Sequence, residues 1–144
     1  MKQMTVLIGI PAAGKTTITK SLFSSHVVVS FDRLPNRTHN DEDKLIMKTC
    51  RSGADLVIDA ANVDKAKRRK YIRYAKEHGY TVHALFVDTS LDVALARNRA
   101  RERQVPEGMI RAYCEKIEYP TVEEGFTNIF IVWNSWDPRD HKEA

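Results

Sequence analysis

The segment GIPAAGKTTITK, residues 9–20, carries glycine, lysine and threonine at the spacing G-x-x-x-x-G-K-[ST]. Glycines let the backbone curl so that successive N–H groups point at phosphate oxygens, and the lysine adds a positive charge. An apolar run, Thr5–Ile10, precedes this segment, and a helical pattern, Lys15–Phe23, follows it. The sequence therefore predicts a phosphate-binding loop between a strand and a helix, with the helix N-terminus behind the phosphates.

We expect this loop to bind ATP or another nucleoside triphosphate, together with Mg²⁺. Lys15 is expected to reach the β- and γ-phosphates, and the Thr16 hydroxyl to coordinate the metal ion. The residues predicted to bind the nucleotide belong to the loop and to the start of its helix: Gly9, Pro11, Ala12, Ala13, Gly14, Lys15, Thr16 and Thr17. The motifs D-x-x-G and N-K-x-D of regulatory GTPases are absent after the later strands. A small kinase remains, and it must supply an acceptor site.

Charged side chains follow the second and third predicted strands. Asp32, in SFDRLPNRTHN, can accept a proton from an attacking hydroxyl or hold a water on the metal, and it can instead cap a turn. Arg33 and Arg37 come next, and either can bind a phosphate on the acceptor. After the third strand, DAAN brings Asp59 and Asn62 beside the same loop. Asp59 can brace the acceptor or bond turn amides, and Asn62 can bind the acceptor or cap the next helix.

The segment ARNRARERQVP, residues 96–106, is rich in arginine. On a helix, Arg97 and Arg101 lie on one face because they are four residues apart, while Arg99 and Arg103 lie on another. An arginine-rich helix and loop after the fourth strand is a suitable lid over bound phosphates. There an arginine neutralises charge on a transferred phosphoryl group, an effect of about 10³–10⁵ in rate in related chemistry. The alternative is a solvated arginine helix.

Strand-like and helix-like segments alternate along the chain. Strands are predicted at residues 5–10, 27–31, 55–59, 80–87 and 128–132, and helices at 15–23, 41–50, 64–78, 91–101 and from Pro106 onward. The second helix is expected to begin at a cap, Asn40 or Asp41. Nearly all strand residues are apolar, as is typical of parallel strands buried on both faces. The pattern predicts an α/β fold of three layers, with a parallel sheet of about five strands covered by helices on both faces.

The length of 144 residues predicts one domain, residues 1–144, with a lid roughly at 97–106. The net charge is +4, and residues 65–76 hold seven basic side chains and no acidic one. This balance favours an anionic partner such as nucleic acid, although a basic helix is also typical of a solvated face. No apolar run reaches the ~18 residues of a membrane span. With only Cys50 and Cys114, we expect a cytoplasmic protein without a membrane partner whose thiols are buried or partly buried. No apolar surface stripe predicts an oligomeric state.

Five segments resemble, in sequence and in order, the P-loop polynucleotide 5′-kinases of phages and nucleic-acid repair: GIPAAGKTT, SFD, VIDAANVDKAKRR, ARNRARERQVP and YPTVEEGF. The resemblance covers roughly residues 4–132, and its combination of D-A-x-N, R-N-x-x-R and V-P is narrower than the phosphate loop alone. It implies transfer of the γ-phosphate of ATP to a 5′-hydroxyl end of DNA or RNA. By motif, Asp32 is then the general base and Asp59 supports the acceptor pocket. Arg101 is the lid arginine, with Arg97 beside it on the nucleotide.

One position departs from the pattern of that family. The family usually has an arginine three residues after the base aspartate, where it holds the phosphate next to the reactive hydroxyl, and Pro35 stands there in this chain. Arg33 or Arg37 is then the candidate for that contact. The phosphatase motif D-x-D-x-T of two-module repair enzymes is absent, so we expect no phosphatase module.

Two other functions compete with a polynucleotide kinase. One is a small-molecule kinase acting on a sugar acid, a nucleoside or an antibiotic, with an uncharged acceptor pocket built within residues 33–50. The other is an ATP-binding switch or a nucleic-acid-binding module without catalysis. Trp133 and Trp136 are expected to cover the end of the last strand, with stacking on a base as the alternative.

Overall fold

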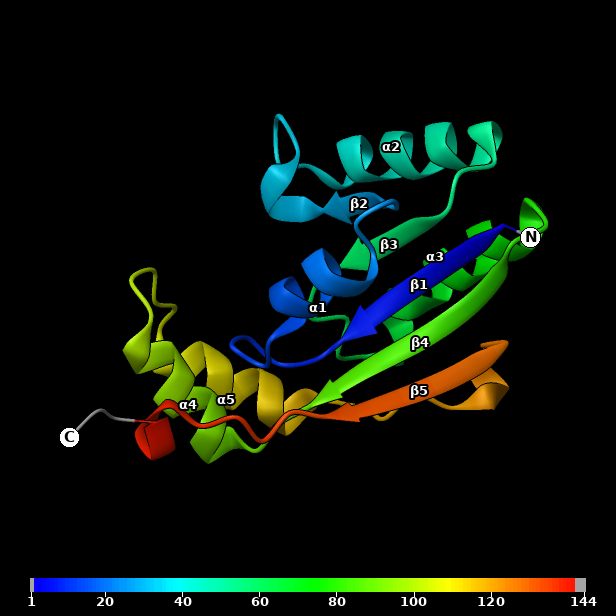
Figure 1. Ribbon diagram of the computed structural model, residues 1–144. Coiled ribbons are helices and arrows are strands. Elements are labelled where there is room, and N and C mark those ends of the chain that lie inside the picture. The colour runs from blue at the N-terminus through cyan, green and yellow to red at the C-terminus, as the bar shows by residue number, and fades with distance from the viewer. Residues whose placement is uncertain (1, 142–144) are drawn as a thin grey trace.

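A parallel sheet of five strands, in the order β2-β3-β1-β4-β5, forms the centre of the computed structural model (Figure 1). The structure describes residues 2–141, except for the side chain of Asp32. The strands are β1 (Gln3–Ile8), β2 (Val27–Ser30), β3 (Leu56–Asp59), β4 (Thr81–Asp88) and β5 (Asn128–Trp133). The connecting helices are α1 (Lys15–Leu22), α2 (His39–Ser52), α3 (Lys65–Glu77), α4 (Leu91–Ala100) and α5 (Glu107–Lys116). Short 3₁₀ helices are η1 (Phe31–Arg33), η2 (Val122–Glu124) and η3 (Pro138–His141).

Alternate residues of β1 pack into different cores because successive side chains of a strand point to opposite faces. Met4, Val6 and Ile8 belong to the core that α3 covers. Leu7 belongs to the core on the other face, where Ile18 of α1 packs. Figure 1 shows α1 and α3 on opposite faces of the sheet, and α4 and α5 beyond the carboxyl ends of its strands. The predicted α/β fold of about five parallel strands, covered on both faces, is confirmed.

The last two helices pack against each other through apolar side chains. Ala94 and Leu95 of α4 pack with Ile110 of α5 in a third core, against residues next to the phosphate loop. This core joins the arginine-rich segment to the loop, because Ile10 and Ala13 are buried in it. Both cysteines are free thiols, Cys50 buried and Cys114 partly buried, as predicted.

Two local predictions are wrong. Helix α2 begins at His39 rather than near Asp41, because the Oγ1 of Thr38 caps it by accepting a hydrogen bond from the backbone N–H of Asp41, at 3.1 Å. Trp133 and Trp136 do not cover the strand end, since they are 60% and 52% exposed. β5 is an edge strand, and only one of its sides pairs with another strand of the sheet.

The basic segment 65–76 is only partly a solvated face. Arg68 is fully buried, and its Nε and Nη2 bind the carboxylate of Glu124 at 2.9 and 3.1 Å. Its Nη1 donates to the backbone carbonyls of Asn62 and Glu118, at 3.0 and 2.9 Å. Arg68 therefore ties the loop between β3 and α3 to the segment that carries Glu118 and Glu124. Within residues 2–141, no helix has the length and the apolar character needed to cross a membrane.

Candidate active site

The loop between β1 and α1 lies at the carboxyl end of a strand with a neighbour on each side, β3 and β4. Ligands of open parallel sheets bind at this edge, where the connections leave in opposite directions. Gly14 at the end of the loop has φ 101°, and a Cβ there would come within 2.5 Å of Asn134 Nδ2 and 2.9 Å of Arg97 Nη2. The left-handed backbone therefore favours glycine at position 14, and any larger residue would also displace the ends of the Asn134 and Arg97 side chains. Beside the loop lies a cavity of about 680 Å³, the phosphate-loop cavity.

Lys15 provides the positive charge nearest to the loop. Its Nζ donates to the backbone carbonyls of Gly9 and Ile10, each at 2.8 Å. Burial lowers the pKa of Lys15 to about 8, the nearby Asp59 carboxylate opposes the shift, and the Arg101 guanidinium adds to it. The ammonium is thus held where its charge is unfavourable. A bound anion would restore its ordinary protonation.

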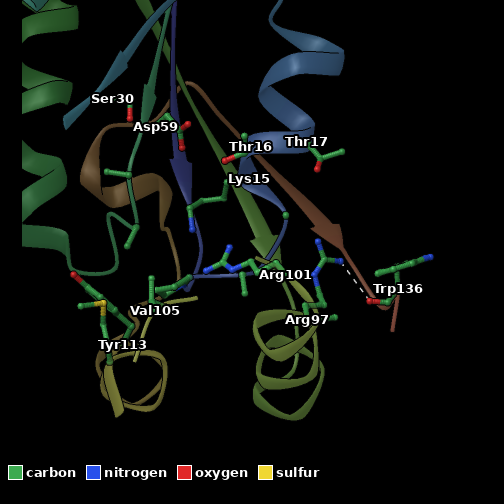
Figure 2. A pocket seen from close by; sticks show the side chains of 17 residues that line it. Lys15, Thr16, Thr17, Ser30, Asp59, Arg97, Arg101, Val105, Tyr113 and Trp136 are labelled. Atoms are coloured by element: carbon green, nitrogen blue, oxygen red, sulfur yellow. Dashed lines mark hydrogen bonds between the residues drawn. The ribbon is translucent and has the colours of Figure 1, made fainter. Parts of the chain in front are cut away.

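Two arginines from the end of α4 join Lys15 at the phosphate-loop cavity. Arg97 and Arg101 both line it, and Figure 2 shows Arg101 extending toward Lys15. Burial lowers the pKa of each arginine, and Arg101 lowers that of Arg97 further by repulsion. Arg97 also donates to the Trp136 carbonyl at 3.4 Å and lies 5.6 Å from the centroid of the Trp136 ring. Three cations held together in this way suit a ligand with several negative charges, such as a triphosphate.

Asn98 holds the loop after α4 in shape, a role that the sequence analysis missed. This side chain is 1% exposed; its Nδ2 donates to the Val105 carbonyl at 2.8 Å, and its Oδ1 accepts from the Val105 N–H at 3.0 Å. The same Oδ1 accepts a hydrogen bond from Nε of Arg101 at 3.3 Å. Arg99 binds Glu107 with two hydrogen bonds, at 2.8 and 2.9 Å. Asn98 therefore positions Arg101, and the asparagine inside R-N-x-x-R was the available signal.

The acceptor side of the site is partly described. Ser30 and Asp59, at the ends of β2 and β3, line the phosphate-loop cavity with Lys15 (Figure 2). Asp32 follows Ser30 within η1, but its side chain lies outside the described part, so its roles as base and metal ligand stay predictions. Arg33 and Arg37 are exposed and are not among the described residues that line this cavity, so contact with an acceptor phosphate also stays a prediction for them.

Asn62 has a structural role in this geometry. Its side chain is buried, and its Nδ2 donates to the carbonyl of Leu7 at 2.7 Å, across from β3 to β1. The backbone of Asn62 has φ 48°, a conformation that asparagine tolerates better than most residues. The next helix is capped by Asp64, whose Oδ1 accepts from the Lys67 N–H at 2.7 Å. Direct contact of Asn62 with a substrate stays a prediction.

Several residues that line the phosphate-loop cavity were not singled out as site residues from the sequence: Ser30, Ala60, Ala61, Ala100, Val105, Met109, Tyr113 and Trp136. Half of them come from a strand end or from the segment after a strand, and the other half come from α4, α5 or the loop between these helices. Tyr113 packs against the core that α4 and α5 share, and it also lines the cavity. Trp136 carried a signal, because its indole ring was one of the two candidates for stacking on a base.

The comparison with known families agrees with this geometry. A family model described as an AAA domain matches residues 4–120. The chain belongs to the AAA domain family. Its fold, with the phosphate-binding loop between β1 and α1, is similar to the folds of solved kinases.

Relatives and solved structures extend over most of the chain. The chain is 26% identical over 154 aligned residues to the bifunctional polynucleotide phosphatase/kinase of Schizosaccharomyces pombe, covering 94% of this chain and 37% of that protein. Its fold is similar to a gluconokinase of Sinorhizobium meliloti (TM-score 0.67, 15% identity, 96% and 86% coverage). It is also similar to Chaetomium thermophilum Kti12 in complex with ADP-AlF3 (TM-score 0.69, 18% identity, 93% and 89% coverage). The chain spans between 16% and 61% of the length of the curated relatives it matches.

Proposed function

We propose that this protein transfers the γ-phosphate of ATP to a 5′-hydroxyl end of DNA or RNA. The observation that carries the proposal is the convergence of Lys15, Arg97 and Arg101 on one cavity beside the phosphate loop, with Asp59 across from them. The similarity to a polynucleotide phosphatase/kinase along nearly the whole chain supports a polynucleotide acceptor. Arg33, at the end of η1, and Arg37 after it are exposed and are suited to bind its phosphates.

The proposed reaction is an in-line displacement. The acceptor oxygen forms a bond to the γ-phosphorus, the bond from that phosphorus to the β–γ bridging oxygen breaks, and ADP leaves. Asp32 takes the proton of the acceptor hydroxyl, while Lys15 and Arg101 neutralise charge on the transferred group. Catalysis by such a site is mostly positioning and charge stabilisation.

Magnesium fits the oxygen donors at this site. The hydroxyl of Thr16 is exposed at the phosphate-loop cavity, and the carboxylate of Asp59 lines the same cavity. Hard oxygen ligands of this kind suit Mg²⁺, which is usually bound by few protein groups together with substrate phosphates. Thr16 and Asp32 are the residues proposed to hold it. The ion would neutralise phosphate charge when bound.

Transfer of label from γ-labelled ATP to a 5′-hydroxyl oligonucleotide tests the proposal. We expect Lys15→Ala and Asp32→Ala each to abolish transfer, whereas Lys20→Ala, an exposed position on the same helix, retains it. The same oligonucleotide with a 5′-phosphate is the control acceptor and should remain unlabelled. Near-normal turnover in either the Lys15 or the Asp32 variant would remove the role assigned to that residue. Bound ATP without any transfer would favour the non-catalytic switch.

A small-molecule kinase is the second candidate. One observation favours it: a further cavity, between α2 and α3, has the size of a small-ligand site. That cavity is not uncharged, because Glu42 and Lys70 both line it. A screen of sugar acids, nucleosides and oligonucleotides with the same labelled ATP separates the two kinases by which acceptor gains the phosphate.

A further inference from the structure

The cavity between α2 and α3, here called the α2–α3 cavity, has a volume of about 550 Å³. It adjoins the phosphate-loop cavity, because Ala60, Ala61 and Tyr113 line both. Its walls are mainly apolar and aromatic, and they include the ring of Phe31 and the side chain of Ala66. A flat ring bound there would lie next to the site where phosphate is transferred.

Glu42 is the acidic residue among the described residues that line this cavity. Its side chain is buried, and its Oε1 accepts a hydrogen bond from the Tyr71 hydroxyl at 2.9 Å. The same oxygen forms an ion pair with Lys70 Nζ at 3.0 Å. Burial and the Glu42 carboxylate raise the pKa of Tyr71, which therefore stays protonated and donates. Burial tends to lower the pKa of Lys70, but hydrogen bonds to Glu42 and Asp43 outweigh it and raise the value, so Lys70 stays charged.

The second oxygen of the carboxylate, Oε2, accepts no hydrogen bond from the described part of the chain, whereas both polar partners of Glu42 bind Oε1. Within the described part of the chain, Nδ1 of His26 is the one side-chain polar atom that is both buried and without a hydrogen-bond partner. Oε2 is therefore not fully enclosed by protein atoms. Because Glu42 lines the α2–α3 cavity, Oε2 is the carboxylate oxygen left to bind a ligand there. A carboxylate oxygen accepts hydrogen bonds and repels anions, so a neutral group with N–H donors suits this position better than a phosphate.

We propose that the α2–α3 cavity binds the 5′-terminal nucleobase of the acceptor, and that Glu42 selects bases with an exocyclic amino group. The proposal rests on the proposed function, because it concerns the acceptor of the same reaction. Stacking on an aromatic wall is tolerant of sequence. Hydrogen bonding to a carboxylate is selective, and among bases it favours an amino group such as that of cytosine. Lys67, exposed at the mouth of the cavity, is suited to the phosphate that follows the base.

The preference among acceptors follows from these contacts. Guanine, adenine and cytosine carry an amino group, whereas thymine offers one N–H between two carbonyl oxygens that a carboxylate repels. A charge-assisted hydrogen bond is among the stronger ones, so we expect kcat/KM about tenfold higher for a terminal G, A or C than for T. An abasic 5′ terminus, which loses the stacking as well, should be the poorest acceptor.

Glu42→Gln gives a sharp test. The amide oxygen can still accept from Tyr71 and Lys70, which leaves its NH₂ group to donate into the cavity. We expect this variant to lose the preference for amino-bearing bases or to reverse it toward thymine, whose O4 accepts a hydrogen bond. Asp43→Asn is the matched control, because Asp43 binds Lys70 at 3.2 Å and is not among the residues that line the cavity. It should keep the wild-type order.

The experiment measures kcat/KM for five oligonucleotides that differ only in the 5′-terminal position, G, A, C, T or abasic, with the wild type and both variants. Equal rates for all four bases in the wild type, or an unchanged order in Glu42→Gln, would overturn the proposal. Thermal melting reports whether Glu42→Gln is folded, and if it is not, the wild-type order alone decides. Failure to phosphorylate any oligonucleotide would instead count against the proposed function.

Discussion

Nucleotide binding should become weaker as the pH rises above about 8, because of Lys15. The free protein holds this ammonium with a pKa lowered to about 8, against 10.5 ordinarily. Phosphate oxygens favour the charged form, so a bound triphosphate should return the pKa toward its ordinary value or above it. Binding must then protonate Lys15 wherever the free protein has lost that proton. Affinity is therefore fully present well below pH 8 and is lost progressively as the pH rises through 8.

The magnitude follows from the fraction of Lys15 that is protonated in the free protein. At pH 7.5 a group with a pKa of about 8 is about three-quarters protonated, and at pH 9 about one-tenth. Binding should therefore take up about 0.2 proton at pH 7.5 and about 0.9 proton at pH 9. The association constant should fall by about eightfold between these two values.

Isothermal titration calorimetry with a non-hydrolysable ATP analogue measures both quantities. Buffers of different ionisation enthalpy report the proton uptake, and above pH 7.5 the terminal phosphate, with a second pKa of about 6, is fully ionised. Lys15→Arg is the control, since arginine remains charged throughout this range and its weaker binding should show no such slope. A constant affinity in the wild type from pH 7.5 to 9, with no proton uptake, would refute the reasoning.

Three further predictions concern single side chains. Ala12 has φ 68°, a conformation that glycine adopts without strain, so Ala12→Gly should raise the unfolding free energy by up to about 1 kcal/mol. Ala13→Gly removes a buried methyl group and should lower the unfolding free energy by about as much. Urea denaturation measures both changes. Asn62→Asp replaces the donor to the Leu7 carbonyl with an acceptor and should lower stability by about 2–3 kcal/mol in the same assay, while the exposed Asn36→Asp should not. Trp136→Ala should raise the KM for ATP about fivefold with little change in kcat if its ring stacks on the donor base. Trp133→Ala, equally exposed but not part of the phosphate-loop cavity, is the control for the kinetic measurement.

The sequence predicts the sheet and the phosphate loop well because both depend on local patterns. Apolar runs of the length of a strand identify β1 and β4, and the spacing from Gly9 to Thr16 identifies the loop between β1 and α1. Ligands of such sheets bind beyond the strand ends, so Asp59 could also be expected beside Lys15, and both line the same cavity.

The sequence does not predict contacts between side chains on separate helices. Glu42 and Tyr71 are 29 residues apart, and neither stands out from its neighbours until the packing of α2 against α3 brings them together. Arg68 looks like the other basic residues around it, yet it is fully buried and binds the carboxylate of Glu124. Such contacts depend on the tertiary structure, because the residue pattern of one helix does not show which side chain of another segment will lie against it.

The hydrogen bonds of Asn98 to both backbone groups of Val105 close the arginine loop into a small ring. These bonds restrict the backbone of the loop, so much of the conformational entropy of ordering it is lost when the protein folds and not when a ligand binds. Any movement of this loop toward a nucleotide must then bend the chain outside residues 98–105. Arg101 lies inside this ring and is bound to Asn98, so its guanidinium would reach the phosphates already oriented.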